Sequence, residues 1–226
     1  MRFSLASASN KARNRAFLLC VFLLGSPMVG LSALPLTTVQ RKSLNQGDVL
    51  THLQRHEKGG TLTVIGWIEA PPAQVWKALS ETSLQKVIYP SVLNSAVERV
   101  ESDGSEVQRA VFDFPWPFDD RWSLHRAVKS PSTCTLSWQR IDGTLTGNTG
   151  SWTLYQSEDG KSTLLYYRVF FDPGLPLVPE SLIQYGMKKE APGIVTHLRR
   201  FLSNPTAEFR ATASEMNGSC AVERKM

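Results

Sequence analysis

The sequence predicts an α+β fold in which a curved antiparallel sheet covers one long C-terminal helix. Through most of the chain, apolar residues alternate with polar ones, which is typical of strands that have one buried face. Turn-forming dipeptides separate these segments at regular intervals, as expected for strands that follow one another in a meander. Near the end, apolar residues step by three or four and predict an amphipathic helix.

Residues 1–33 predict a signal peptide. A basic, Ser-rich opening precedes nine consecutive apolar residues at 16–24, and small residues follow up to Ala33. An uncleaved membrane anchor is the alternative, because residues 16–34 are just long enough to span a bilayer, although two glycines and a proline interrupt them. We therefore expect an exported protein, periplasmic or secreted, with attachment to the membrane by this segment as the alternative.

The positive charge of the chain lies mostly in this N-terminal segment. The whole sequence has a formal net charge of +5, but residues 1–33 contain four basic side chains and no acidic one. The remainder has 21 basic and 20 acidic side chains. Such a nearly neutral domain has no broad cationic field for phosphates, so we expect no nucleic-acid partner.

A hairpin and two short helices are expected first. The hairpin has strands at 48–56 and 61–69, joined by a glycine pair at Gly59 and Gly60. The helices are expected at 72–80, where proline occupies the first turn, and at 83–88, before Pro90.

Six further strands are expected in a meander, with turn signals between most of them. They are predicted at 96–101, 106–114, 121–129, 133–140, 147–156 and 163–172.

The long helix is predicted from an apolar stripe that begins at Ile183 and ends at Phe201. Pro192 is expected to kink or split it. These elements define one domain at 47–203. The polar lead at 34–46 and the polar tail at 204–226 are both expected to be flexible.

The cysteines, the histidines and a search for known catalytic motifs give little indication of a metal or catalytic site. After cleavage of the signal peptide only Cys134 and Cys220 remain, enough for one disulfide at most, and a free buried thiol is the favoured interpretation. His52 and His56 would lie roughly 13 Å apart on the predicted strand, too far for a shared metal. No nucleotide-binding, hydrolase or zinc-protease motif occurs. We therefore expect no metal and no cofactor, and we favour a protein without catalytic activity over an enzyme.

Five segments in the same order resemble the START and Bet v 1-like superfamily. They lie at 64–79, 89–92, 114–121, 150–154 and 172–174, the last one directly ahead of the terminal helix. The Pro-Trp-Pro segment that ends at Arg121 is particularly similar to START lipid-binding domains. The resemblance covers residues 48–202 and implies a helix-grip fold, in which the sheet wraps around the terminal helix. It does not specify the ligand, because such proteins include lipid carriers and aromatic cyclases.

Strand alternation predicts which side chains face the interior between sheet and helix. Charged residues mark the wet face, which turns Phe112 and Phe114 inward on one strand and Tyr167 and Phe171 inward on another. The candidate ligand-binding residues are Phe112, Phe114, Trp116, Phe118, Arg121, Trp152, Tyr167, Phe171, Ile183, Met187 and Ile194. The alternative is that the aromatic residues only pack the core, that Trp116 caps it, and that Arg121 pairs with a neighbouring aspartate.

These observations predict that the chain binds a hydrophobic small molecule, such as a lipid, sterol or isoprenoid, in an internal cavity, and transfer of that molecule is a further expectation. The alternative from another class is a cyclase- or dehydratase-type enzyme that uses His125, Arg121 or Tyr167 in the same cavity. A purely structural module is a third interpretation. We expect a monomer that contacts membranes transiently when the terminal helix opens and exposes Ile183 and Met187.

Overall fold

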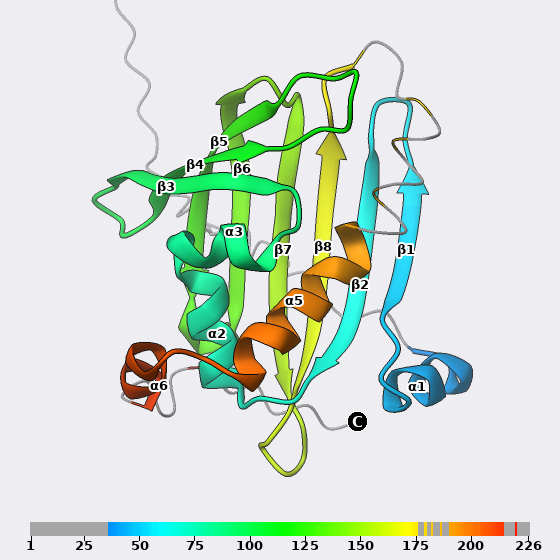
Figure 1. Cartoon of the computed structure of the whole chain (residues 1–226), viewed down its shortest axis with the longest axis vertical. Coiled ribbons are helices and arrows are strands. Elements are labelled where there is room, and N and C mark those ends of the chain that lie inside the picture. Colours follow the sequence, from blue (N-terminus) through cyan, green and yellow to red (C-terminus); the bar gives the residue numbers. More distant parts are fainter. Residues whose placement is uncertain are drawn as a thin grey trace, which may run out of the picture. The chain divides into compact units, whose positions relative to one another are not determined.

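The computed structural model describes residues 36–175, 179, 182, 186, 190–214 and 220 (Figure 1). The chain forms two units, Met1–Leu34 and Pro35–Met226, and all described residues belong to the second. The predicted signal peptide at 1–33 lies outside the described residues.

None of the helices formed by the described residues has the length and apolar character needed to cross a bilayer.

The core of the domain is one sheet of eight antiparallel strands in the order β1-β2-β8-β7-β6-β5-β4-β3. The strands are β1 (Leu50–Arg55), β2 (Gly60–Ile68), β3 (Val92–Val100), β4 (Glu106–Phe112), β5 (Arg121–Ser130), β6 (Thr135–Gly143), β7 (Gly147–Gln156) and β8 (Thr163–Asp172). The first hairpin therefore joins the meander through the pairing of β2 with β8. Register shifts within the β3–β4 and β5–β6 pairs interrupt the ladder, as bulges do where a sheet bends.

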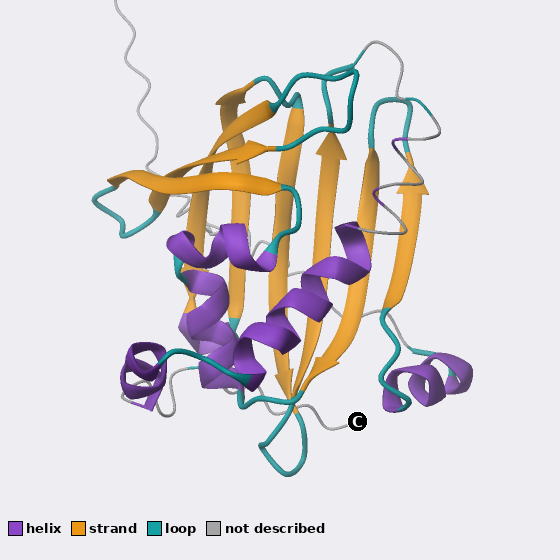
Figure 2. Cartoon of the chain, viewed as in Figure 1, coloured by secondary structure: helices purple, strands orange, loops and turns teal. Residues whose placement is uncertain are grey.

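Helices cover one face of this sheet, with α2, α3 and α5 on the side toward the viewer (Figure 2). The helices are α1 (Thr38–Asn45), α2 (Pro72–Ser80), α3 (Gln85–Ile88), α5 (Ala191–Ser203) and α6 (Ala207–Ser214). Short 3-10 turns lie at Thr82–Leu84 and Pro131–Thr133. The predicted α+β class, with an antiparallel sheet and a C-terminal helix, is confirmed.

Helix α5 packs closely on β2 because of a glycine. A Cβ atom at Gly66 would lie 2.9 Å from a side-chain methyl of Val195, so only glycine allows this approach without a shift. Arg199 fixes the same contact, since its Nε donates a hydrogen bond to the carbonyl oxygen of Trp67 at 2.8 Å. Ile194, Val195 and Leu198 thereby join Val64 and Ile68 in the hydrophobic core.

Pro192 does not split the described part of this helix. Helix α5 begins at Ala191, so Pro192 lies in the first turn, where its missing amide hydrogen would have no partner anyway. The start of the predicted stripe, at Ile183, lies outside the described residues.

No helix was predicted at 34–46, but helix α1 forms there. The side chain of Thr37 accepts from the amide of Gln40, whose own side chain accepts from the amide of Thr37. This capping box satisfies two amides that the helix leaves without partners. Leu44 is the one described residue of this helix that is buried, and a single apolar contact produces no periodic pattern in the sequence.

The described part of the tail at 204–226 also contains a helix that was not predicted. Helix α6 occupies part of it, and Phe209 packs edge-on against Phe201 of α5, with 5.0 Å between ring centroids. Cys220 forms a disulfide with Cys134, so the prediction of a free thiol was wrong. The two cysteines are 86 residues apart, and the fold brings their Cα atoms to 5.0 Å, within the range that a disulfide can bridge.

Candidate functional site

A cavity of about 780 Å³ lies between the inner face of the sheet and the helices. Its wall takes residues from all eight strands, β3 through Val92 alone, and from α2, α3 and α5. Apolar side chains make up much of it, and they include Leu53, Leu62, Leu79, Val92, Ala110, Phe112, Phe114, Ala127, Leu136, Trp138, Val169, Phe171 and Ile194. Ligand pockets in proteins typically have volumes of ~300–1,000 Å³, so this cavity can hold a small molecule.

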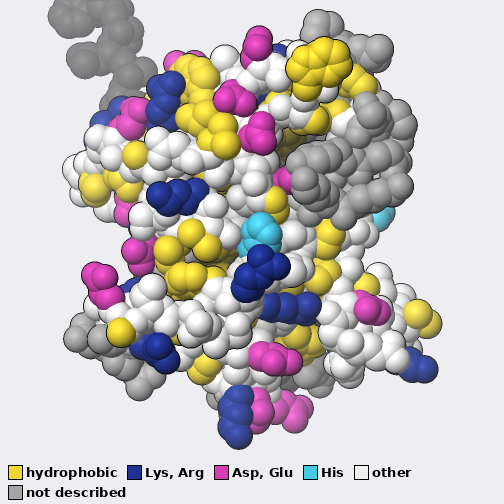
Figure 3. All heavy atoms as spheres, in the orientation of Figure 1, with side chains coloured by type: hydrophobic (Ala, Val, Ile, Leu, Met, Phe, Trp, Pro, Cys, Tyr) yellow, Lys and Arg dark blue, Asp and Glu magenta, His cyan; other side chains and the backbone are white. Residues whose placement is uncertain are grey.

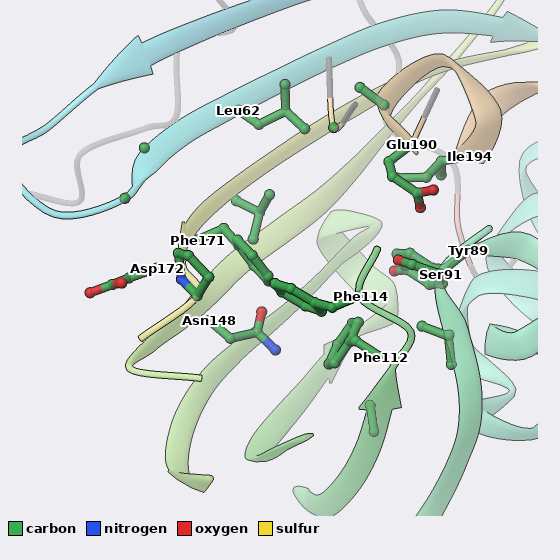
Figure 4. Close-up of a pocket in the computed structure, with 18 of the residues that line it drawn as sticks. Leu62, Tyr89, Ser91, Phe112, Phe114, Asn148, Phe171, Asp172, Glu190 and Ile194 are labelled. Atoms are coloured by element: carbon green, nitrogen blue, oxygen red, sulfur yellow. The ribbon is translucent and has the colours of Figure 1, made fainter. Parts of the chain in front are cut away.

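Three phenylalanine rings form one side of the cavity and lie together in Figure 4. Phe114 stacks on Phe171 with 6.2 Å between centroids, and Phe112 meets Phe171 edge-on at 6.4 Å. Alternation along β4 and β8 turns these residues to the same face of the sheet, although β4 and β8 are separated by three other strands. The sheet must therefore curve to bring their rings together.

A second aromatic group centres on Tyr167, four residues before Phe171 on β8. Tyr167 stacks between Trp152, with 4.1 Å between centroids, and Trp138, with 5.9 Å. The indole Nε1 of Trp152 donates a hydrogen bond to the hydroxyl of Tyr89 at 2.7 Å. Burial raises the pKa of both Tyr89 and Tyr167 above the ordinary tyrosine value, so both phenols stay neutral at physiological pH.

Glycine at position 150 makes room for the second group. Gly150 is the cross-strand partner of Trp138, and a Cβ atom there would come within 2.6 Å of the Trp138 ring and of the Arg168 carbonyl oxygen. Only a residue without a side chain allows the indole to lie across β7 at this point.

Polar side chains from three elements also enter the wall. Gln108 on β4 and His125 on β5 are cross-strand partners, and Gln85 comes from α3. The Oε1 atom of Gln108 accepts from Gln85 Nε2 at 3.0 Å and lies 3.3 Å from His125 Nε2. We call Gln85, Gln108 and His125 the polar cluster.

Charged residues anchor the polar cluster from the side. Gln108 Nε2 donates to Glu106 Oε2 at 2.7 Å, and Glu106 Oε1 accepts from Lys129 Nζ at 2.5 Å. Gln108 thus uses both ends of its amide, which fixes its orientation.

His125 is neutral at physiological pH. Burial lowers its pKa from 6.5 to about 4, against a smaller opposite effect of the Ser123 backbone. The neutral ring has one N–H, which the Nε2 tautomer would donate to Gln108. Nδ1 is buried and makes no hydrogen bond of ordinary geometry with the described residues.

This depressed pKa predicts a loss of stability in acid. The unfolded state takes up a proton near the ordinary value of 6.5 while the folded state resists until about pH 4, so stability falls between these values. The loss of stability that His125 causes between neutral pH and pH 4 is about 3 kcal/mol, since each pKa unit corresponds to ~1.4 kcal/mol. Urea denaturation at neutral pH and at about pH 4 should show a smaller acid loss for His125→Gln than for the wild type. Equal losses in the two proteins would contradict this role.

The charged wall residues are mostly near solvent. Arg55, Glu57, Lys58 and Asp113 are exposed, whereas Asp172 is buried and Glu190 is partly buried. Asp172 accepts a hydrogen bond from the amide of Gly174 at 2.9 Å. The carboxylate of Glu190, at the start of α5, points into the cavity (Figure 4), and its Oε1 is buried without a hydrogen-bond partner among the described residues.

The structure brings five of the predicted ligand-binding residues to the cavity wall. These are Phe112, Phe114, Tyr167, Phe171 and Ile194. Trp152 is fully buried behind the wall, where it supports Tyr167. Ile183 and Met187 lie outside the described residues.

Trp116, Phe118 and Arg121 are not among the described residues of the wall. Pro115 does line the cavity, but Trp116 is 92% exposed, because the loop turns back at Phe118, whose amide donates to the Pro115 carbonyl. The peptide bond between Trp116 and Pro117 is cis. Arg121 Nε is buried and has no hydrogen-bond partner in the part of the chain that the structure describes. The expected position of Trp116 and Phe118 in the wall is therefore not observed.

Sequence reasoning missed most of the polar wall. Gln108 is in phase with Ala110 and Phe112 on β4, so the same alternation was an available signal for its inward direction, although it was not used. Asn148, whose Oδ1 accepts from Trp138 Nε1 at 2.9 Å, was missed because an inward polar residue has no signal without its partner.

The described residues contain no group of three or more His, Cys, Asp or Glu side chains able to hold a metal ion.

Neither a protein-family model nor a curated protein matches this sequence, whereas many solved structures are similar in fold. A START superfamily protein from Mycobacterium smegmatis has a TM-score of 0.55 at 13% identity, over 65% of this chain and 99% of that one. A STAR-related lipid transfer protein from Xanthomonas axonopodis has a TM-score of 0.55 at 16% sequence identity, and the match covers 69% of this chain and 94% of that one. Human STARD10 has a TM-score of 0.54 at 10% sequence identity, and the match covers 84% of this chain and 91% of that one. The domain therefore has the helix-grip fold of START superfamily proteins, as its sequence segments suggested.

Proposed function

We propose that this chain, which has the START superfamily fold, binds and carries a hydrophobic small molecule such as a lipid, sterol or isoprenoid. The observation that carries the proposal is the cavity of about 780 Å³, whose wall contains two groups of aromatic rings, one around Phe171 and one around Tyr167. An apolar ligand that leaves water for such a wall gains ~25 cal/mol per Å² of buried apolar surface. The similar structure from Xanthomonas axonopodis is that of a STAR-related lipid transfer protein, which is consistent with this class of ligand.

Catalysis is less well supported than binding. His125 and Tyr167 line the same cavity, but the low pKa of His125 makes it a weak base at neutral pH. Arg121, the third candidate, is not among the described wall residues. A cyclase-type reaction would need a proton acceptor and an oxyanion donor at the ligand, and the described residues offer no such pair with established geometry.

We also propose that the protein is exported and acts as a monomer that touches membranes transiently. The signal-peptide pattern of residues 1–33 supports export, and so does the disulfide between Cys134 and Cys220, because disulfides persist in oxidising compartments.

A titration with N-phenyl-1-naphthylamine tests the binding proposal. The fluorescence of this neutral apolar probe rises when it leaves water, so we expect a saturable increase with one probe bound per chain. The chain unfolded in urea is the control, since it has the same side chains but no cavity. A linear, non-saturating increase with the folded chain would contradict the proposal.

A further inference from the structure

The volume of the cavity limits the size of its ligand. At roughly 30 Å³ for each water-sized group, 780 Å³ has room for roughly 26 non-hydrogen atoms. A single alkyl chain with a small polar head, or a compact ring system, fits within this limit. A phospholipid with two long acyl chains exceeds it.

The charges of the wall limit the ligand further. In the part of the wall that the structure describes, the basic residues are Arg55 and Lys58, and both are exposed near the β1–β2 turn. The less exposed charged residues are acidic, namely Asp172 and Glu190. A carboxylate or phosphate buried away from the β1–β2 turn would thus meet repulsion from Glu190 and no basic side chain among the described wall residues, which costs several kcal/mol.

The polar cluster offers hydrogen bonds without charge. Gln108 is 3% exposed and His125 is 5% exposed, and both line the cavity together with Gln85. Buried polar groups in an otherwise apolar wall typically fix the orientation of a ligand. A neutral imidazole and two amides can donate to a hydroxyl or carbonyl oxygen and accept from a hydroxyl, but they cannot neutralise an anion.

We propose that the cavity selects an uncharged lipid with one chain or one compact ring system, whose single hydroxyl or carbonyl group binds at the polar cluster. This inference rests on the proposed binding function and adds the chemical class of the ligand. It excludes fatty-acid anions by charge and two-chain phospholipids by volume.

Displacement of N-phenyl-1-naphthylamine from the full-length chain tests this selection. The competitors are 1-dodecanol, dodecane and, in weakly alkaline buffer, dodecanoate, which share one chain length and differ in the head group. Dioleoylphosphatidylcholine vesicles test the volume limit. The wild type should bind 1-dodecanol about tenfold more tightly than dodecane or dodecanoate, the value of one good buried hydrogen bond, and should extract no phospholipid.

Variants locate the head group. Gln85→Leu and Gln108→Leu should each weaken 1-dodecanol binding about tenfold and leave dodecane binding unchanged. Gln54→Leu is the matched control, because Gln54 is exposed on β1 and absent from the described wall. If Gln108→Leu does not fold, Gln85→Leu and the wild-type competitor series still decide the question.

Three results would overturn the proposed ligand selectivity. Dodecanoate binds more tightly than 1-dodecanol, one phospholipid is extracted per chain, or the variants weaken the binding of dodecane as much as the binding of 1-dodecanol. In each of these cases the chain still binds the probe, so the proposed function survives. Failure of the probe itself to bind would instead remove the proposed function, and this inference with it.

Discussion

Replacing Trp152 with alanine is expected to lower the free energy of unfolding by about 3–5 kcal/mol. Trp152 is 1% exposed, and its ring stacks on Tyr167 at 4.1 Å between centroids. The substitution leaves a void behind the cavity wall and removes the hydrogen bond to the Tyr89 hydroxyl at 2.7 Å. Urea denaturation followed by far-ultraviolet circular dichroism measures the change.

Trp116→Ala is the matched control for this prediction. Trp116 is 92% exposed, so its removal should change stability by no more than about 0.5 kcal/mol. A loss at Trp152 as small as that at Trp116 would mean that the stacked aromatic group does not support the sheet.

The second large effect is expected on ligand binding. Ala110 on β4 is buried in the cavity wall, and Ala110→Phe would fill part of the cavity with a ring. A ligand that loses the burial of one comparably large apolar group loses ~1.5–3 kcal/mol, which corresponds to about a hundredfold weaker binding at the upper end. The titration with N-phenyl-1-naphthylamine measures this change.

Ala96→Phe is the control for the filled cavity. Ala96 is exposed on the edge strand β3 and is not part of the described wall, so the same substitution there should leave probe binding unchanged. A larger side chain in a packed site can lower the free energy of unfolding by ~1–3 kcal/mol, so the stability of Ala110→Phe must be measured as well. A folded Ala110→Phe that binds the probe as the wild type does would place the ligand elsewhere.

The sheet was largely predictable from the sequence because its strands alternate and their turns carry glycine, proline or aspartate. The predicted bounds of β7 and β8 agree with the structure residue for residue. Strand β6 begins two residues after its predicted start, because Pro131–Thr133 forms a 3-10 turn and Cys134 adopts a left-handed backbone with φ 49°. Such local geometry leaves no trace in a period-two pattern.

Helices α1 and α6, near the two ends of the described chain, were missed for a different reason. Helix α1 is held by a capping box and by Leu44, and α6 is held by Phe209 against α5. Each depends on one or two tertiary contacts and not on an apolar stripe. The Thr37-to-Gln40 spacing was the available signal for α1. The disulfide that ties Cys220 to Cys134 joins residues 86 apart, which no local pattern could pair.

The apolar half of the candidate site was more predictable than the polar half. Charged residues were used to mark the wet face and only apolar residues were sought on the inner face, so an uncharged polar residue that points inward, such as Asn148 or Gln108, escaped notice. Their burial is tolerated because Trp138 Nε1 donates to Asn148, and Glu106 and Gln85 hold the amide of Gln108. Those partners come from different elements, so only the folded chain shows them.

Native mass spectrometry of the chain, purified without detergent, tests the central claim most directly. We expect a complex heavier than the polypeptide by the mass of one small molecule, which organic extraction releases and accurate mass identifies. Ala110→Phe should carry much less of it. A chain that has the bare polypeptide mass and remains so after incubation with a mixed lipid extract would contradict the claim that this cavity binds a hydrophobic ligand.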